Sequence, residues 1–128
     1  MLDYPQKGSD RTVKLYLAGP MSGKAGFNYP RFQEVAEALR SRHYDIVSPH
    51  EMHDGDTSQS WEWYLRKDLT IMLECDGLIL LEDWEESRGA RLELFVADKT
   101  SMFVYTLDKD LNLQASIYGS QDRTGGIL

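Results

Sequence analysis

The sequence lacks the features of secreted, membrane-spanning and disordered proteins. Its 128 residues include one cysteine and four prolines, so we expect neither a disulfide framework nor a proline-rich linker. No apolar run approaches the length of a membrane helix, and the polar residues 1–11 do not read as a signal peptide. We therefore expect a cytoplasmic protein with no membrane partner.

Basic residues are also scarce. Fourteen Lys and Arg stand against 21 Asp and Glu, which gives a formal net charge of −7. Binding to a nucleic-acid backbone needs a basic surface, so we expect no nucleic-acid partner, although a local cradle for a small anion remains open. The hydrophobic fraction of 41% is that of a globular protein, and the length suits a single domain spanning 1–128.

Alternating segments of strand and helix character fill the chain. Hydrophobic patterns and turn residues predict four strands, at residues 13–18, 45–48, 77–82 and 102–106. They predict helices between these strands, at residues 29–42, 61–74 and 88–98. The polar residues 50–60 read as a loop, and residues 111–118 read as an edge strand. We expect a core over about 13–107 and flexible ends at 1–11 and 119–128.

This order predicts a mainly parallel α/β sheet of four to five strands, covered by helices on both faces. In such sheets, ligands bind at the carboxyl ends of the strands. Ser87, Arg88 and Gly89 follow the third strand and open a helix, whose free N–H groups attract anions, so they read as a phosphate cradle. Glu93 lies about one turn further along.

Two more residues point toward the same edge. Asp68 shares the apolar stripe of its helix with Leu65 and Met72, so its carboxylate faces inward, either as a structural ion-pair member or as an acid or base with a shifted pKa. Tyr16 alternates with Leu15 near the end of the first strand, where it serves either as packing or as a hydrogen-bond partner of a carboxylate.

Other polar segments carry weaker signals. The loop Gly19-Pro20-Met21-Ser22-Gly23 permits close backbone approach but lacks the dinucleotide and P-loop signatures. Residues 50–56 hold two histidines and three acids, yet without the helical i, i+4 spacing of common zinc sites, so we expect no metal. His50 follows the second strand directly and remains within reach of a ligand there.

Four segments together resemble the nucleoside 2-deoxyribosyltransferase superfamily, over roughly residues 13–106. They are Leu15-Tyr16-Leu17-Ala18-Gly19-Pro20-Met21-Ser22-Gly23, Tyr64-Leu65-Arg66-Lys67-Asp68-Leu69, Cys75-Asp76-Gly77 and Ser87-Arg88-Gly89-Ala90-Arg91-Leu92-Glu93. The sequence is most similar to the small, often phage-encoded branch and to the nucleoside-monophosphate N-glycosidases. The resemblance implies a flavodoxin-like (Rossmann-like) three-layer sandwich that needs no cofactor.

It also implies roles for individual residues. Glu93 falls at the nucleophile, Tyr16 at the residue that orients it, and Asp68 at a contact to the sugar hydroxyl or the leaving base. Ser87 and Gly89, with Arg88 between them, fall where relatives hold the 5′-phosphate. The loop Gly19, Pro20, Met21, Ser22 and Gly23 falls where they border base and sugar. Asp68, Asp83, Glu85 and Glu86 remain alternatives for the acid.

Two functions are compatible with these residues. The first is an N-glycosidase or deoxyribosyltransferase that acts on a nucleoside 5′-monophosphate through a covalent glycosyl-Glu93 intermediate. The second is a catalytically inactive module that binds or sequesters a nucleotide, as a phage accessory protein would. Trp84 and Phe27 lie in loops where exposed aromatic rings need cover, so we also expect a homodimer or larger homo-oligomer.

Overall fold

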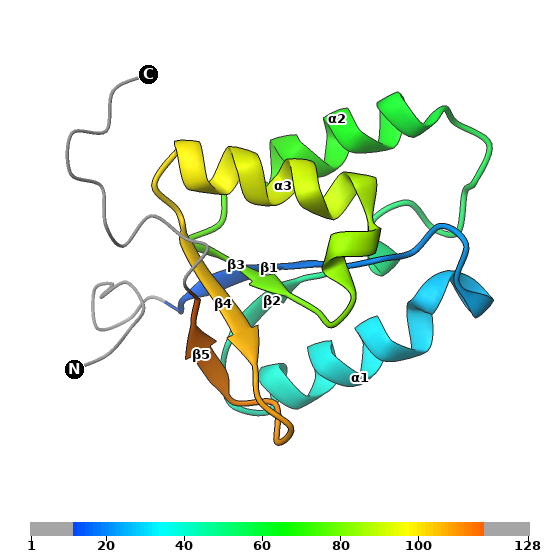
Figure 1. Ribbon diagram of the computed structural model, residues 1–128. Helices are drawn as coiled ribbons and strands as arrows, with labels where there is room; N and C mark the ends of the chain where they lie inside the picture. The colour runs from blue at the N-terminus through cyan, green and yellow to red at the C-terminus, as the bar shows by residue number, and fades with distance from the viewer. Residues whose placement is uncertain (1–11, 117–128) are drawn as a thin grey trace.

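A five-stranded sheet forms the middle layer of the protein, which we describe from a computed structural model over residues 12–116. The strands follow the order β2-β1-β3-β4-β5, and β5 alone pairs antiparallel with its neighbour. Figure 1 shows α2 and α3 on one face of the sheet and α1 on the other. The three-layer, mainly parallel α/β architecture predicted from the sequence is confirmed.

The predicted elements are present with small changes at their ends. The strands are β1 (Lys14–Ala18), β2 (Asp45–Val47), β3 (Gly77–Leu80), β4 (Phe103–Leu107) and β5 (Leu113–Ala115). The helices are α1 (Tyr29–Arg40), α2 (Trp61–Met72) and α3 (Arg88–Lys99). The expected edge strand is confirmed over three residues of β5, whereas the end regions 1–11 and 119–128, expected to be flexible, lie outside the described residues.

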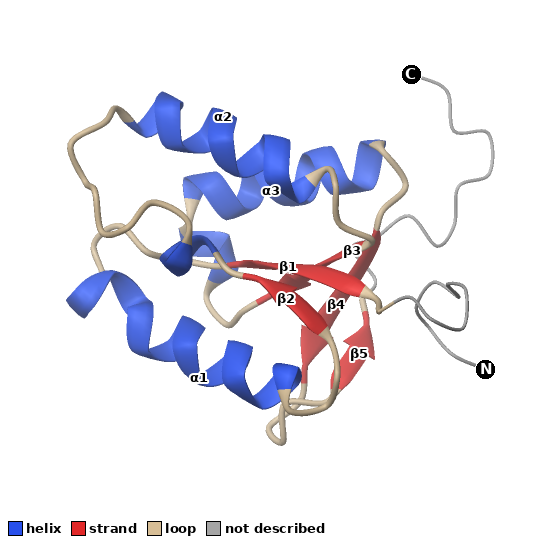
Figure 2. Cartoon of the chain, turned by 180° about the vertical axis from the view of Figure 1, so that it is seen from behind, coloured by secondary structure: helices blue, strands red, loops and turns tan. Residues whose placement is uncertain are grey.

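Strand alternation divides the core into two layers. Leu15 and Leu17 pack with Phe32 and Leu39 of α1 on one face of the sheet. Tyr16 points to the opposite face, where its neighbours include Met72 at the end of α2 and small residues of α3. The predicted orientation of Tyr16 is therefore confirmed: it points to the face of the sheet that α2 and α3 cover (Figure 2).

Three short 3-10 helices were not predicted: η1 (Ala25–Asn28), η2 (Pro49–Glu51) and η3 (Trp84–Glu86). All three follow the carboxyl end of a strand, so they shape the edge of the sheet where ligands bind in such folds. Gly19 fixes a close approach at this edge, because a Cβ there would lie 2.9 Å from Cβ of Leu81. Within residues 12–116, no helix is both long and apolar enough to cross a membrane.

Candidate active site

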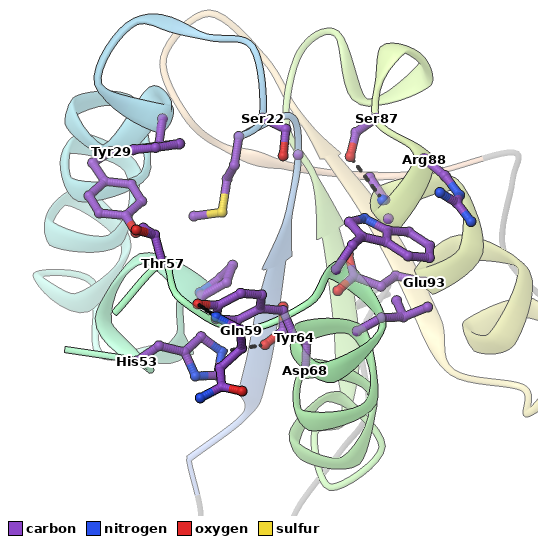
Figure 3. A pocket seen from close by; sticks show the side chains of 18 of the residues that line it. Ser22, Tyr29, His53, Thr57, Gln59, Tyr64, Asp68, Ser87, Arg88 and Glu93 are labelled. Atoms are coloured by element: carbon purple, nitrogen blue, oxygen red, sulfur yellow. Dashed lines mark hydrogen bonds and ion pairs between the residues drawn. The ribbon is translucent and has the colours of Figure 1, made fainter. Parts of the chain in front are cut away.

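A pocket of about 580 Å³ opens at the carboxyl ends of β1 and β3, between the loops that follow them and α2. This volume is typical of pockets that bind small molecules. Figure 3 shows Ser87, Arg88 and Glu93 on one side of the pocket and Tyr29 and Thr57 across from them. Asp68 lines the same pocket from α2, so carboxylates that are distant in the sequence lie in one site.

Glu93 is the most buried acidic residue of this pocket. It is 6% exposed and lies on the inner face of α3 with Ala90 and Ala97, whose small side chains leave room for it. The fully buried Tyr16 donates a hydrogen bond of 2.8 Å from its hydroxyl to Oε2 of Glu93. The Tyr16 ring itself does not line the pocket, so it acts on a ligand only through Glu93.

Burial shifts the pKa of both partners. The pKa of Glu93 rises to about 8 because the carboxyl is desolvated, and the nearby Asp68 adds to the shift while the Tyr16 hydrogen bond opposes it. Burial and the charges of Glu93 and Asp68 raise the pKa of Tyr16 well above its ordinary value. The phenol therefore stays protonated and keeps its role as a hydrogen-bond donor.

Asp68 has a partner that the sequence did not reveal. Nε2 of His53 lies 2.9 Å from Oδ1 of Asp68, and both side chains are less than one-fifth exposed, at 17% and 18%. Desolvation raises the pKa of Asp68, although the hydrogen bond to His53 works in the opposite direction. His53 lines the pocket, so an Asp-His pair faces the same space as Glu93.

The residues predicted as an anion cradle lie at the amino end of α3. Oγ of Ser87 accepts a hydrogen bond of 3.1 Å from the backbone N–H of Ala90, which makes Ser87 the N-cap of α3. Ser87 thus gives the N–H of Ala90 an acceptor. The N–H groups of Arg88 and Gly89, in the same first turn, have no acceptor within the helix and can meet a ligand. Ser87, Arg88 and Gly89 all line the pocket.

Charged side chains surround this cradle. The guanidinium of Arg88 stacks on the ring of Trp61, with its carbon 3.6 Å from the ring centroid. Lys24 lies 3.5 Å from Asp83 and 3.3 Å from Glu86, so it holds the loop after β1 against the loop after β3. Arg88 lines the pocket beside the helix terminus, whereas Lys24 does not.

The loop after β1 contributes only some of its predicted residues. Gly19, Met21 and Ser22 line the pocket, whereas Pro20 and Gly23 do not. The carbonyl of Pro20 instead accepts a hydrogen bond of 3.0 Å from Nδ2 of Asn28, which ties the loop to η1. Gly23 has a φ of +81°, so its glycine serves the turn rather than a ligand contact.

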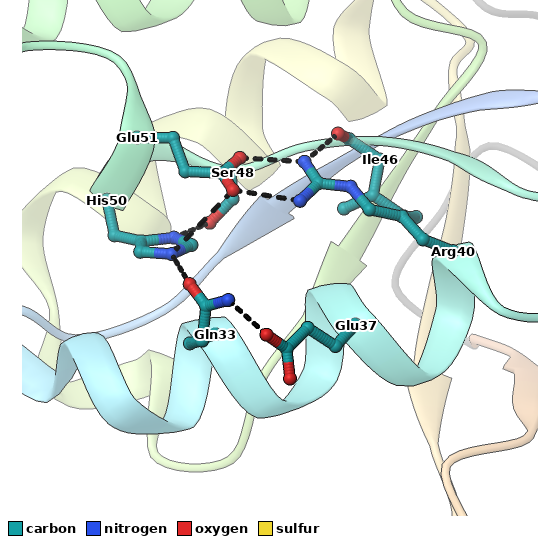
Figure 4. A network of polar contacts seen from close by, with 7 residues as sticks. All are labelled: Gln33, Glu37, Arg40, Ile46, Ser48, His50 and Glu51. Carbon is teal, nitrogen blue, oxygen red and sulfur yellow. Dashed lines mark hydrogen bonds and ion pairs between the residues drawn. The ribbon is translucent and has the colours of Figure 1, made fainter.

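His50 is part of a separate polar network (Figure 4). Its Nδ1 lies 2.5 Å from Oγ of Ser48, and its Nε2 lies 2.7 Å from Oε1 of Gln33. Arg40 extends the network through an ion pair of 2.7 Å with Glu51. Burial lowers the pKa of His50. The network joins α1 to β2 and η2, and His50 does not line the pocket.

Several pocket residues lay outside the sequence predictions. These are chiefly aromatic or loop side chains: Phe27, Tyr29, Pro49, His53, Asp56, Thr57, Gln59, Trp61, Tyr64 and Leu65. Trp61 lines the pocket and its ring supports the guanidinium of Arg88. Among residues 12–116, no group of three or more His, Cys, Asp or Glu side chains has an arrangement that could hold a metal ion.

The family described as "Domain of unknown function (DUF4406)" matches residues 13–106, the span over which the sequence resemblance was found. The chain belongs to this family. No curated protein matches the chain. The DUF4406 match covers β1, β2, β3, all but the last residue of β4, and every acidic residue of the pocket, so the site described above lies within the family domain.

Solved structures show the fold that this DUF4406 chain shares. A 2-deoxyribosyltransferase from Bacillus psychrosaccharolyticus aligns with a TM-score of 0.59 at 20% identity, covering 74% of this chain and 72% of that one. A 2-deoxyribosyltransferase from Leishmania mexicana aligns with a TM-score of 0.59 at 13% identity, covering 88% and 84%. A conserved protein from Enterococcus faecalis V583 also gives 0.59, at 24% identity, covering 76% and 64%. The domain therefore has the flavodoxin-like fold of these 2-deoxyribosyltransferase structures.

Proposed function

We propose that the protein cleaves the N-glycosidic bond of a nucleoside 5′-monophosphate, with Glu93 as the nucleophile. The hydrogen bond of 2.8 Å between Tyr16 and Glu93 carries this proposal, because it fixes a buried carboxyl at the edge of a pocket of ligand size. A module that only bound a nucleotide would not need this pair. The shared fold of the deoxyribosyltransferases supports the same class of reaction.

The chemistry follows that of a retaining glycosidase. An oxygen of the ionised Glu93 attacks the anomeric carbon of the sugar, the bond to the base nitrogen breaks, and a glycosyl ester forms. Water or a second base then attacks the same carbon and releases Glu93 as a carboxylate. Tyr16 assists the first step because its hydrogen bond both orients the carboxyl and favours its ionised form.

The amino end of α3 supports a phosphorylated substrate. The N–H groups of Arg88 and Gly89 and the guanidinium of Arg88 suit a 5′-phosphate at this end of the pocket. Because this phosphate does not react, its binding energy can hold the sugar against Glu93. A nucleotide is therefore preferred to the corresponding nucleoside.

Among the four acidic candidates, the contacts favour Asp68 as the acid for the leaving base. Asp83 and Glu86 pair with Lys24, and the side chain of Glu85 is exposed. Asp68 lies in the pocket and has a raised pKa because of its burial, which favours the protonated form that an acid needs.

Base release from a panel of ribo- and deoxyribonucleoside monophosphates, measured by chromatography, tests the proposal. We expect the wild type to release a base from at least one of them. Glu93→Gln should abolish release while calorimetry still detects binding of that nucleotide, because the amide keeps the shape but cannot form the ester. Tyr16→Phe should slow release by less, because it removes only the orienting hydrogen bond.

Glu74→Gln is the matched control, because Glu74 is an exposed side chain outside the pocket. It should leave base release unchanged. If the wild type binds a nucleotide but releases no base from any monophosphate, and Glu93→Gln binds it equally well, the protein is a nucleotide-binding module and the glycosidase proposal is wrong.

A further inference from the structure

His53 lines the pocket, but the reaction steps proposed above do not involve it. It comes from the polar segment between η2 and α2, and its Nε2 lies 2.9 Å from Oδ1 of Asp68. This distance is that of a hydrogen bond, so one proton lies between Nε2 of His53 and Oδ1 of Asp68. Asp68 keeps its second carboxylate oxygen free of that bond, so it can meet a ligand while it remains paired.

Aromatic residues of α2 hold the imidazole in this position. The His53 ring packs edge-on against Tyr64, at 5.1 Å between centroids, and in a tilted arrangement against Trp63, at 5.5 Å. The Tyr64 hydroxyl in turn donates a hydrogen bond of 2.5 Å to the carbonyl of Asp56, and the N–H of Asp56 bonds the carbonyl of His53. The loop is thus closed on α2 around the histidine, which fixes its distance from Asp68.

We propose that His53 is a positioning residue for Asp68, which orients the acid and resupplies the proton that Asp68 gives to the departing base. The inference rests on the proposed glycosidase function and names the acid-side machinery of that same site. His53 acts through Asp68, and the carboxyl of Asp68 is the group that meets the base.

Over one turnover the enzyme neither gains nor loses a proton. When Glu93 attacks the anomeric carbon, the electron pair of the broken bond passes to the base, and Asp68 delivers a proton to it. His53 then shares its proton with Asp68. When water attacks the glycosyl ester, its proton passes to the Asp68–His53 pair and Glu93 departs as a carboxylate. The sum is a nucleotide and water giving the free base and the sugar phosphate.

Several titratable groups face this pair from the surrounding elements. Tyr16 approaches Asp68 from β1, Glu93 from α3, and Asp56 lies beside His53 in its own loop. Tyr16 stays neutral, and the carboxyl of Glu93 must ionise for the attack.

His53→Gln tests the proposal, because the amide can still donate a hydrogen bond to Asp68 but cannot release a proton. With a purine nucleotide, whose base leaves poorly, kcat should fall about 100-fold while KM changes little. With a nucleotide of an electron-poor pyrimidine such as 5-fluorouracil, the base needs less protonation, so the loss should be under about tenfold.

His43→Asn is the matched control, because His43 lies in a turn outside the pocket with a φ of +72° that asparagine tolerates. Thermal unfolding of His53→Gln beside the wild type shows whether the loop is still folded, and His53→Leu repeats the test without a hydrogen bond. Equal losses for both leaving groups, or an unchanged kcat in an active enzyme, would overturn the role of His53 alone. A wild type that releases no base would instead overturn the proposed function, and the proton role with it.

Discussion

At Glu93, the ionisation that the proposed function needs conflicts with the stability of the folded protein. Its carboxyl is nearly enclosed, and burial raises its pKa to about 8. In an unfolded chain the same group has a pKa near the ordinary value of 4.5. Folding therefore disfavours ionisation of the group that must ionise to act, and the Tyr16 hydrogen bond offsets only part of that cost.

The raised pKa of Glu93 makes the stability of the folded protein depend on pH. Between pH 4.5 and about 8, the unfolded chain has lost the Glu93 proton and the folded chain keeps it. The folded state then binds more protons, so this group lowers stability as pH rises through that window. Glu93→Gln should accordingly be more stable than the wild type at pH 8, with the advantage shrinking toward pH 4.5. Glu74→Gln is the control for denaturant unfolding at both pH values; a gap for Glu93→Gln that does not change with pH would contradict the burial argument.

The residues that the sequence predicted best were those on regular elements. Asp68 and Glu93 follow from helix faces and Tyr16 from strand alternation, and the structure brings these residues together. His53 was missed because the segment between η2 and α2 has no periodicity that assigns a side chain to a face. Its partner Asp68 is 15 positions away, and only the packing of the loop on Tyr64 sets their distance.

At the scale of secondary structure, two serines begin the helices that border the pocket. Ser60 caps α2 by accepting from the N–H of Trp63 at 3.1 Å, and Ser87 caps α3 by accepting from that of Ala90 at the same distance. Loss of either cap should destabilise the protein by about 1 kcal/mol. Ser87, however, lines the proposed phosphate site, whereas Ser60 does not.

Ser87→Ala and Ser60→Ala therefore form a matched pair. Both should lower the melting temperature by similar amounts. Only Ser87→Ala should also weaken binding of the nucleoside monophosphate and narrow its advantage over the nucleoside, measured by calorimetry. Equal effects of the two substitutions on nucleotide binding would show that the amino end of α3 does not hold the phosphate.

Sequence patterns predicted some of the secondary-structure elements and missed others. The order and type of the strands and long helices were predictable because alternation and apolar stripes specify them. The 3-10 helices were not. In η1, Gly26, Phe27 and Asn28 all have positive φ values, a conformation that the hydrogen bond from Asn28 to the Pro20 carbonyl supports. Contacts between distant loops determine such segments, and local propensity does not.

The order of the strands determines where the pocket lies in the molecule. β1 lies between β2 and β3. The connection after β1 leads to β2 and the connection after β3 leads to β4, so the two run in opposite directions and open a crevice between the carboxyl ends of β1 and β3. The expected homo-oligomer stays a prediction. Phe27 is 47% exposed, as that argument requires, whereas Trp84 packs against the core between the sheet and α3 and needs no further cover.

The central claim is a covalent bond between Glu93 and the substrate sugar, and trapping that bond tests it most directly. A monophosphate with fluorine at C2 of the sugar slows both steps by destabilising the positively charged transition state, so the ester should accumulate. Mass spectrometry of the wild type should show the mass of the sugar phosphate added to the peptide that contains Glu93, and Glu93→Gln should show none. Base release without any adduct, or an adduct on another residue such as Asp68, would contradict the account.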